Sequence, residues 1–219
     1  MLLQLVMKKI NDLPEKIPIF PLSNFIIFPE TTVPLNIFEP RYIQMIDDSM
    51  KSNRMIGMIQ PKRSSDLSNS LYDVGCLGKI TSFNETKDGR YLIVINGISR
   101  FEVLQEEISK KLYRECIVNY KNYSKDLTDK KEDLKFSDLE LIFKNIKSIF
   151  KKQGYLIDWK ELEKQSLDLT INTLSMASPF TMEEKQILLE TIDIQSRKKK
   201  LEEISNTYLM DNFNNKTLQ

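Results

Sequence analysis

The spacing of apolar residues changes once along the chain, and this change limits what the chain can fold into. From Ile17 to about Asn119, short apolar runs are broken by Pro, Gly and Asn, a pattern typical of strands joined by turns. After Lys135 the apolar residues recur at helical spacing. We therefore predict an α+β fold, with a strand-rich first half and a helical bundle after it.

Six apolar runs are the candidate strands of the first half, and they cover residues 17–20, 33–38, 55–60, 74–83, 91–95 and 116–118. Asp88-Gly89 lies between two of them and supplies the backbone conformation of a hairpin turn, which predicts antiparallel pairing. Asn96-Gly97 predicts a bulge, a bend or a second turn. Pro40 suits the first turn of a helix, and Tyr42 follows it on an apolar face.

The charge-dense stretch 122–136 has little to bury and marks the predicted boundary between the halves. Ser137 with Glu140, and Thr181 with Glu184, have the spacing of capping boxes and predict two helix starts. Gly154 is expected to end the first of these helices, and one or two shorter helices should lie within 159–176. The predicted parts are an extension (1–16), a strand-rich lobe (17–121), a linker (122–136), a helical lobe (137–210) and a disordered tail (211–219).

Histidine is absent from the sequence, which excludes Ser-His-Asp and Cys-His catalysis and removes the commonest metal ligand. The two cysteines, Cys76 and Cys116, stand far apart without a CxxC motif, so we expect two reduced core residues rather than a zinc site or a disulfide. Lys and Arg number 32 against 31 Asp and Glu, and such a balance gives no support to a nucleic-acid partner. We expect neither a metal nor a cofactor.

The beginning of the chain, residues 1–9, places a short apolar run before its charges, unlike a signal peptide, and either Met1 or Met7 could be the native start. No apolar run approaches the roughly 18 residues that span a bilayer. We therefore expect a cytoplasmic protein that does not enter the membrane.

Motifs of nucleotide hydrolysis and peptide cleavage are also missing. Gly78-Lys79 is the only Gly-Lys pair, but Ile80 follows it and Asp73 stands where a phosphate-binding loop has glycine. No serine lies in a glycine-rich nucleophile segment that a Ser-Lys peptidase would need. The basic run 197–200 sits among helical residues and is interpreted as a solvated helix face. We do not expect an enzyme.

Four consecutive large apolar residues, 25–28, occupy a connection between two predicted strands. Such a segment either folds onto the core or offers a contact surface to a partner. We expect two of the four in the core and assign Phe25 and Ile26 to the surface. The candidate peptide-binding or partner-binding residues are Phe25, Ile26, Phe28 and Tyr42.

The segments 19–29 (IFPLSNFIIFP) and 34–42 (PLNIFEPRY) resemble the opening of the amino-terminal domain of Lon proteases. Segments 72–80, 88–91, 96–101 and 185–190 resemble later parts of that domain in the same order, so the likeness covers about 17–209. Two departures, Glu30 in place of a common glycine and Asn36 in place of a frequent histidine, affect the expected loop shape rather than the fold.

The resemblance implies a pseudobarrel of mixed strands, related to PUA-like folds, followed by a helical bundle. In Lon this region helps to recognise substrate proteins, whereas ATP use and cleavage belong to later domains, which we do not expect in this chain. It also implies a structural signature, within which we expect Glu39 to pair with Arg100 or Arg41, because buried charges persist when they are paired. The signature residues are Phe38, Glu39, Pro40, Arg41, Gly97, Arg100 and Phe101.

The expected function is that of a free-standing, non-catalytic module that binds unfolded or peptide segments of client proteins, within protein quality control. A full-length Lon or another protease is a further candidate partner. An RNA-binding role, by analogy with PUA-like folds, is one alternative. A small-molecule pocket in the helical half near Trp159 is another.

Overall fold

The computed structural model describes residues 10–62, 70–128 and 136–214. The chain divides into two compact units, Met1–Asp129 and Lys130–Gln219, and each is described by itself. The division falls within the stretch 122–136. No helix of the described residues is long and apolar enough to cross a membrane.

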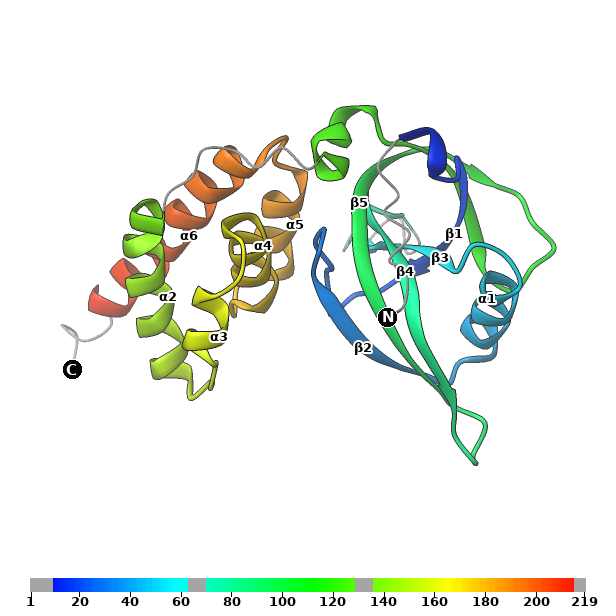
Figure 1. Ribbon diagram of the computed structural model, residues 1–219, viewed down its shortest axis with the longest axis horizontal. Coiled ribbons are helices and arrows are strands. Elements are labelled where there is room, and N and C mark those ends of the chain that lie inside the picture. The colour runs from blue at the N-terminus through cyan, green and yellow to red at the C-terminus, as the bar shows by residue number, and fades with distance from the viewer. Residues whose placement is uncertain (1–9, 63–69, 129–135, 215–219) are drawn as a thin grey trace. The chain divides into compact units, whose positions relative to one another are not determined.

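In the described part of the first unit, six strands form one mixed sheet in the order β2-β5-β4-β3-β1-β6, and β5 also pairs with β6 (Figure 1). This additional pairing closes β5, β4, β3, β1 and β6 into a ring, while β2 is attached to β5 alone among the described strands. All six predicted strands are present, which confirms the α+β fold. Their bounds are β1 Lys16–Pro21, β2 Thr32–Ile37, β3 Met55–Ile59, β4 Val74–Glu85, β5 Tyr91–Glu107 and β6 Arg114–Asn119.

The long strand β5 is bent by a bulge where the sequence predicted an irregularity. Gly78 of β4 faces Gly97, but the adjacent Leu77 faces Ser99, so Ile98 is the extra residue. A bulge bends its strand and increases its twist, which lets one half of β5 pair with β2 and the other with β6. The predicted hairpin between β4 and β5 is also confirmed, and Gly89 adopts the left-handed conformation (φ 78°) that its turn requires.

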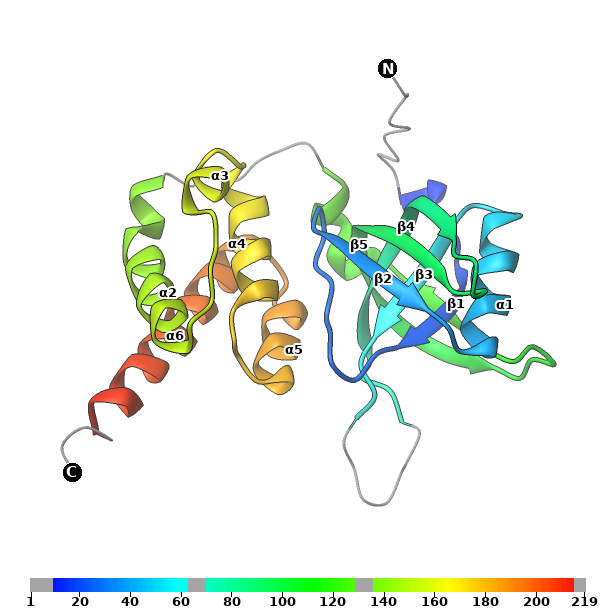
Figure 2. The same cartoon turned by 90° about the horizontal axis from the view of Figure 1, so that it is seen from below.

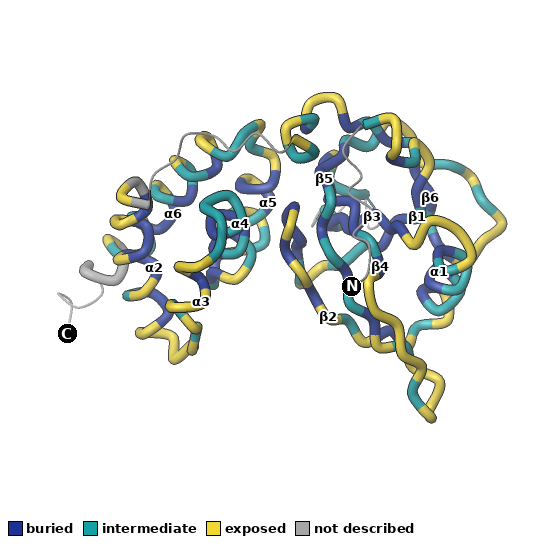
Figure 3. Tube along the Cα trace, viewed as in Figure 1, coloured by how far each residue is buried: buried dark blue, intermediate teal, exposed yellow. Residues whose placement is uncertain are grey.

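The core of this unit lies inside the ring, and every residue of β3 is buried (Figure 3). Both cysteines are buried and are free thiols, as predicted. Gly78-Lys79 lies within β4, in agreement with a structural role. Part of the predicted extension also packs here: Leu13 joins the core, following a 3-10 turn at Ile10–Asp12.

Helix α1, Pro40–Met50, begins at Pro40 as predicted and buries one face against the ring (Figure 1). Two tyrosines of the sheet unit hold the polar face of the helix. Tyr91 donates a hydrogen bond to Asp47 at 3.0 Å, and Tyr113 donates one to Asp48 at 2.8 Å.

Among its described residues, the helical unit contains a short 3-10 turn, Phe136–Leu139, and five α-helices. The capping box of Thr181 and Glu184 is confirmed, as is Gly154 (φ 74°) as the helix end. The predicted cap at Ser137 is wrong, because the 3-10 turn precedes the helix and Leu139 is its N-cap residue. The helices are α2 Glu140–Gln153, α3 Trp159–Glu163, α4 Leu167–Ala177, α5 Met182–Glu190 and α6 Ile194–Asn214.

Two features of α6 differ from expectation. The helix continues to Asn214, into the stretch 211–219 that was predicted to be a disordered tail, whose last residues lie outside the described part. Arg197, interpreted as part of a solvated basic face, is only 1% exposed. Its guanidinium donates hydrogen bonds to the Leu188 carbonyl at 2.9 Å and the Asn172 amide oxygen at 2.5 Å, so it links α6 to α5 and α4.

Candidate functional site

An opening lies beside the closed ring, between β2 and the end of β1. The pairing of β1 with β6 ends at Ile19, opposite Arg114, so Phe20 and Pro21 continue beyond it. A hollow of about 410 Å³ occupies this opening, and we call it the β1–β2 hollow. Its lining residues are Phe20, Pro21, Leu22, Ser23, Asn24, Leu35, Asn36, Ile37, Phe38, Glu39, Arg41 and Tyr42.

Tyr42 is the most buried polar side chain of the β1–β2 hollow, with 6% exposure. Its ring centroid lies 4.2 Å from that of Phe20, and its hydroxyl donates a 3.4 Å hydrogen bond to the Pro21 carbonyl. Burial raises the pKa of Tyr42 above its usual value, so the phenol stays neutral at physiological pH. The hollow therefore has an aromatic, uncharged base.

Phe38 stands at the margin of the hollow with 66% of its surface exposed. Next to it, Arg41 binds Glu39 through Nε (2.9 Å) and Nη2 (2.7 Å), and its guanidinium lies 4.5 Å from the centroid of the Tyr42 ring. The predicted pairing of Glu39 with Arg41 is confirmed, but the pair is half-exposed rather than buried. The alternative pairing with Arg100 is wrong, because Arg100 binds Asp126.

A second hollow, of about 640 Å³, shares Pro21, Ser23, Arg41 and Tyr42 with the first. Here the Arg114 guanidinium makes two hydrogen bonds to the Glu106 carboxylate, at 2.6 and 2.5 Å. This contact holds the pKa of Glu106 below its usual range. Each of the two arginines that face these hollows is thus bound to a carboxylate.

The apolar segment 25–28 does not line either hollow. Ile26 (4% exposed) and Phe28 (0%) are buried together with Ile27, and only Phe25 is partly exposed. The expectation that Ile26 lies at the surface is therefore wrong. Thr31 fixes the segment, since its hydroxyl donates to the Phe28 carbonyl at 2.7 Å.

Three other signature residues, Pro40, Gly97 and Phe101, support the fold and do not line the β1–β2 hollow. Pro40 opens α1, Gly97 packs against the Phe28 carbonyl, and Phe101 (0% exposed) fills the centre of the ring. Sequence reasoning missed Pro21 to Asn24 and Leu35 as lining residues. Pro34 was a usable signal, because proline inside a strand marks the edge of a sheet.

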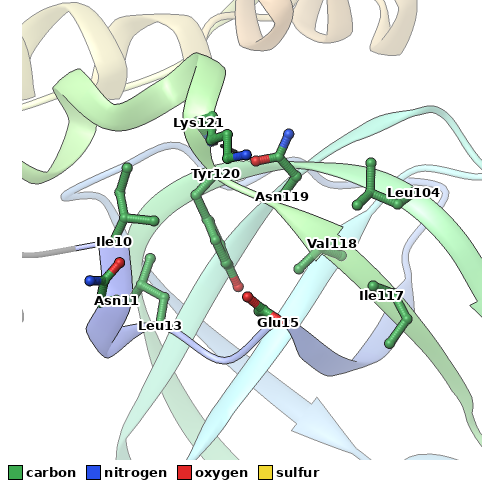
Figure 4. A pocket seen from close by; sticks show the side chains of 10 residues that line it. All are labelled: Ile10, Asn11, Leu13, Glu15, Leu104, Ile117, Val118, Asn119, Tyr120 and Lys121. Carbon is green, nitrogen blue, oxygen red and sulfur yellow. Dashed lines mark hydrogen bonds between the residues drawn. The ribbon is translucent and has the colours of Figure 1, made fainter.

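Figure 4 shows a further hollow of the sheet unit, of about 540 Å³, which the sequence did not predict. Tyr120 extends into it and donates a 2.7 Å hydrogen bond to the Pro14 carbonyl. The exposed Leu104 lies on its margin. Among the residues that the structure describes, no group of three or more His, Cys, Asp or Glu could hold a metal ion.

In the helical unit, Trp159 packs edge-on against Phe143 and Phe150, with ring centroids 6.2 and 5.8 Å away. Lys147 lies 5.2 Å from the centroid of the Trp159 ring. The tryptophan is thus part of an aromatic cluster that joins α2 and α3.

A mixed sheet closed into a ring, with a hollow beside β2 and a helical unit after it, defines an α+β module. The family model described as "ATP-dependent protease La (LON) substrate-binding domain" matches residues 16–207, and the chain belongs to this family.

Similar proteins agree with this assignment. The Lon protease of Dictyoglomus thermophilum is 25% identical over 205 residues, and that of Desulfosudis oleivorans is 27% identical over 202 residues. Each alignment covers 87% of this chain and 24% of the relative, so the chain spans about a quarter of these relatives' length.

Two solved structures share the fold. A Lon N-terminal domain protein from Xanthomonas campestris has a TM-score of 0.62 at 18% identity, covering 86% of this chain and 96% of that one. The N-terminal domain of the Mycobacterium avium complex Lon protease has a TM-score of 0.60 at 17% identity, covering 87% and 98%. The predicted Lon amino-terminal fold is confirmed.

Proposed function

We propose that the chain recognises protein substrates by binding their unfolded, apolar segments at the β1–β2 hollow. The observation that carries this proposal is Phe38, a large apolar side chain that is 66% exposed at the margin of a hollow lined by both apolar and polar side chains. Exposed aromatic side chains beside a pocket are typical anchors of peptide binding. The family description, a substrate-binding domain, supports the same role.

In this proposal the chain binds clients and does not cleave them. The match to the Lon relatives covers only the part that the family model describes as substrate-binding. A protease of the Lon type would then be the partner that receives the clients, and the chain would act in protein quality control.

The charges around the hollow favour a polypeptide over RNA. Arg41 and Arg114 are each bound to a carboxylate, so neither offers a free positive charge to a phosphate. The net charge of the chain is only +1, which gives no long-range attraction for a polyanion.

The test is the anisotropy of dye-labelled peptides cut from an unfolded client, titrated with the full chain at low and high salt. We expect binding that changes little with salt, because apolar contacts are not screened. Strong RNA binding that weakens steeply with salt, without peptide binding, would overturn the proposal.

A matched pair of variants locates the site. Phe38→Ser should weaken peptide binding by about tenfold, the loss typical of one interface anchor. Ile108→Ser is the control, because Ile108 is a fully exposed apolar residue that lines neither the first nor the second hollow. Equal affinities of the two variants would show that the β1–β2 hollow is not the binding site.

A further inference from the structure

Strand β2 has one edge that pairs with no other described strand. A hydrogen bond next to β2 shows which of its residues direct their backbone groups toward β5: the Gly97 N–H donates to the Thr31 carbonyl at 2.8 Å. Because backbone groups of successive residues point to opposite sides of a strand, Val33, Leu35 and Ile37 face β5. The backbone groups of Thr32, Pro34 and Asn36 therefore point away from β5.

The presence of proline at position 34 agrees with this assignment of the outward-pointing residues. Proline has no N–H to donate, and it is found in sheets where that donor would not face a neighbouring strand. The free edge of β2 thus carries the N–H groups of Thr32 and Asn36 and the carbonyls of all three outward residues. All three side chains are exposed.

On the opposite side of the opening, the end of β1 also has one unpaired edge among the described strands. β1 pairs with β3 through Phe20 and Pro21, but its pairing with β6 has already ended at Ile19. The β1–β2 hollow is lined both by this end of β1 and by Leu35 and Asn36 of β2. Figure 2 shows the connection that runs from β1 to β2. At this position both β1 and β2 therefore have an edge that pairs with no described strand.

We propose that a substrate polypeptide binds here as an extended strand, whose backbone pairs with the free edge of β2 and fills the opening. This inference rests on the proposed function and adds the conformation and chemistry of the bound segment. The free edge of β2 runs from Thr32 to Asn36, and at roughly 3.3 Å per residue it accommodates a bound segment of about five residues.

The lining of the hollow selects the side chains of that segment. Its charged residues, Glu39 and Arg41, are bound to each other at 2.7 Å, so the hollow presents no unpaired charge to the segment. Alternate side chains of a bound strand would enter the hollow and contact Leu35 and Tyr42. The substrate is therefore an uncharged segment with apolar residues at every second position.

The variant Asn36→Pro tests backbone pairing directly. It removes the outward N–H of Asn36 without removing a bond to β5, and Pro34 shows that an outward position of this strand accepts proline. We expect peptide affinity to fall about tenfold, from the lost hydrogen bond and the bulk of the ring. Asn36→Ala keeps the N–H and should bind within about twofold of the wild type.

A second measurement keeps the wild-type chain and changes the peptide. N-methylation at one set of alternate residues should abolish binding, whereas N-methylation at the other set should leave it, because only every second N–H of a paired strand faces β2. This result decides the proposal even if Asn36→Pro does not fold.

Failure of this proposal differs from failure of the proposed function. If Asn36→Pro binds as the wild type does and both N-methylated sets behave alike, while Phe38→Ser still loses affinity, the hollow binds peptides without strand pairing. If no peptide binds the wild type, the proposed function itself is wrong.

Discussion

Asp126 receives three hydrogen bonds from Arg100: from Nη2 at 2.7 Å, from Nε at 2.9 Å and from the backbone N–H at 2.9 Å. The two side chains are 1% and 8% exposed. The guanidinium also lies 4.2 Å from the centroid of the Tyr123 ring. The 3-10 segment Lys121–Leu127 is thereby attached to β5, although the sequence placed most of it in a linker.

Asp126→Ala should strongly destabilise the sheet unit. The substitution leaves the buried Arg100 guanidinium without its carboxylate, and such a loss costs about 3–5 kcal/mol. Hydrogen exchange of the β5 amides in the full chain measures it, and we expect their protection to fall by that amount.

The matched control is Glu39→Ala, which breaks the exposed ion pair with Arg41. Exposed ion pairs contribute at most about 1 kcal/mol to stability, so the hydrogen-exchange protection of the β5 amides should change little. Similar losses in the two variants would show that the Arg100 pair stabilises no more than a surface contact.

The local elements of the fold could be predicted because their signals are local. Asp88-Gly89 determines its own turn, and Pro40 starts its own helix. The partner of Arg100 could not be predicted, because Asp126 is brought to β5 only by the folded ring and lies in a stretch whose composition is that of a linker.

The candidate site was predictable to the same degree. Glu39, Arg41 and Tyr42 are close in sequence, and they line one hollow together. The opposite wall, which includes Ser23, depends on where the chain returns after β1. An apolar run such as 25–28 shows that its residues need burial but not which of them reach the core.

Gly97→Ala should destabilise the sheet unit, because a Cβ at this position would lie 2.1 Å from the Phe28 carbonyl oxygen. The clash is with backbone, which cannot rotate away, and overpacking of this kind costs about 1–3 kcal/mol. Gly89→Asn is the control, since Asn tolerates the left-handed turn and nothing surrounds the position. Hydrogen-exchange protection of the β5 amides should fall in Gly97→Ala alone. Unchanged protection in that variant would contradict the close approach of Gly97 to the Phe28 carbonyl.

Cys76 and Cys116 should not react with a thiol reagent in the folded protein. Both are 0% exposed, and burial raises the pKa of Cys116 to about 11, so roughly one molecule in a thousand holds its thiolate at pH 8. Colorimetric titration should find almost no reactive thiol without urea and both thiols in urea. Rapid labelling of either residue in the native protein would contradict its burial.

Thr181→Ala should destabilise the helical unit, whereas Ser137→Ala should not. The Thr181 hydroxyl accepts a hydrogen bond from the Glu184 N–H at 3.2 Å, and the Glu184 carboxylate accepts one from the Thr181 N–H at 2.8 Å. Loss of such a cap costs about 1 kcal/mol. Ser137 is exposed in the 3-10 turn before α2 and is not its N-cap, so its replacement should stay within about 0.5 kcal/mol.

The fluorescence of Trp159, the only tryptophan of the chain, reports on this comparison because it lies in the helical unit. In urea titrations the midpoint should fall for Thr181→Ala and remain for Ser137→Ala. The opposite order would mean that the sequence pattern at 137–140, rather than the observed N-cap at Leu139, describes the start of α2 in solution.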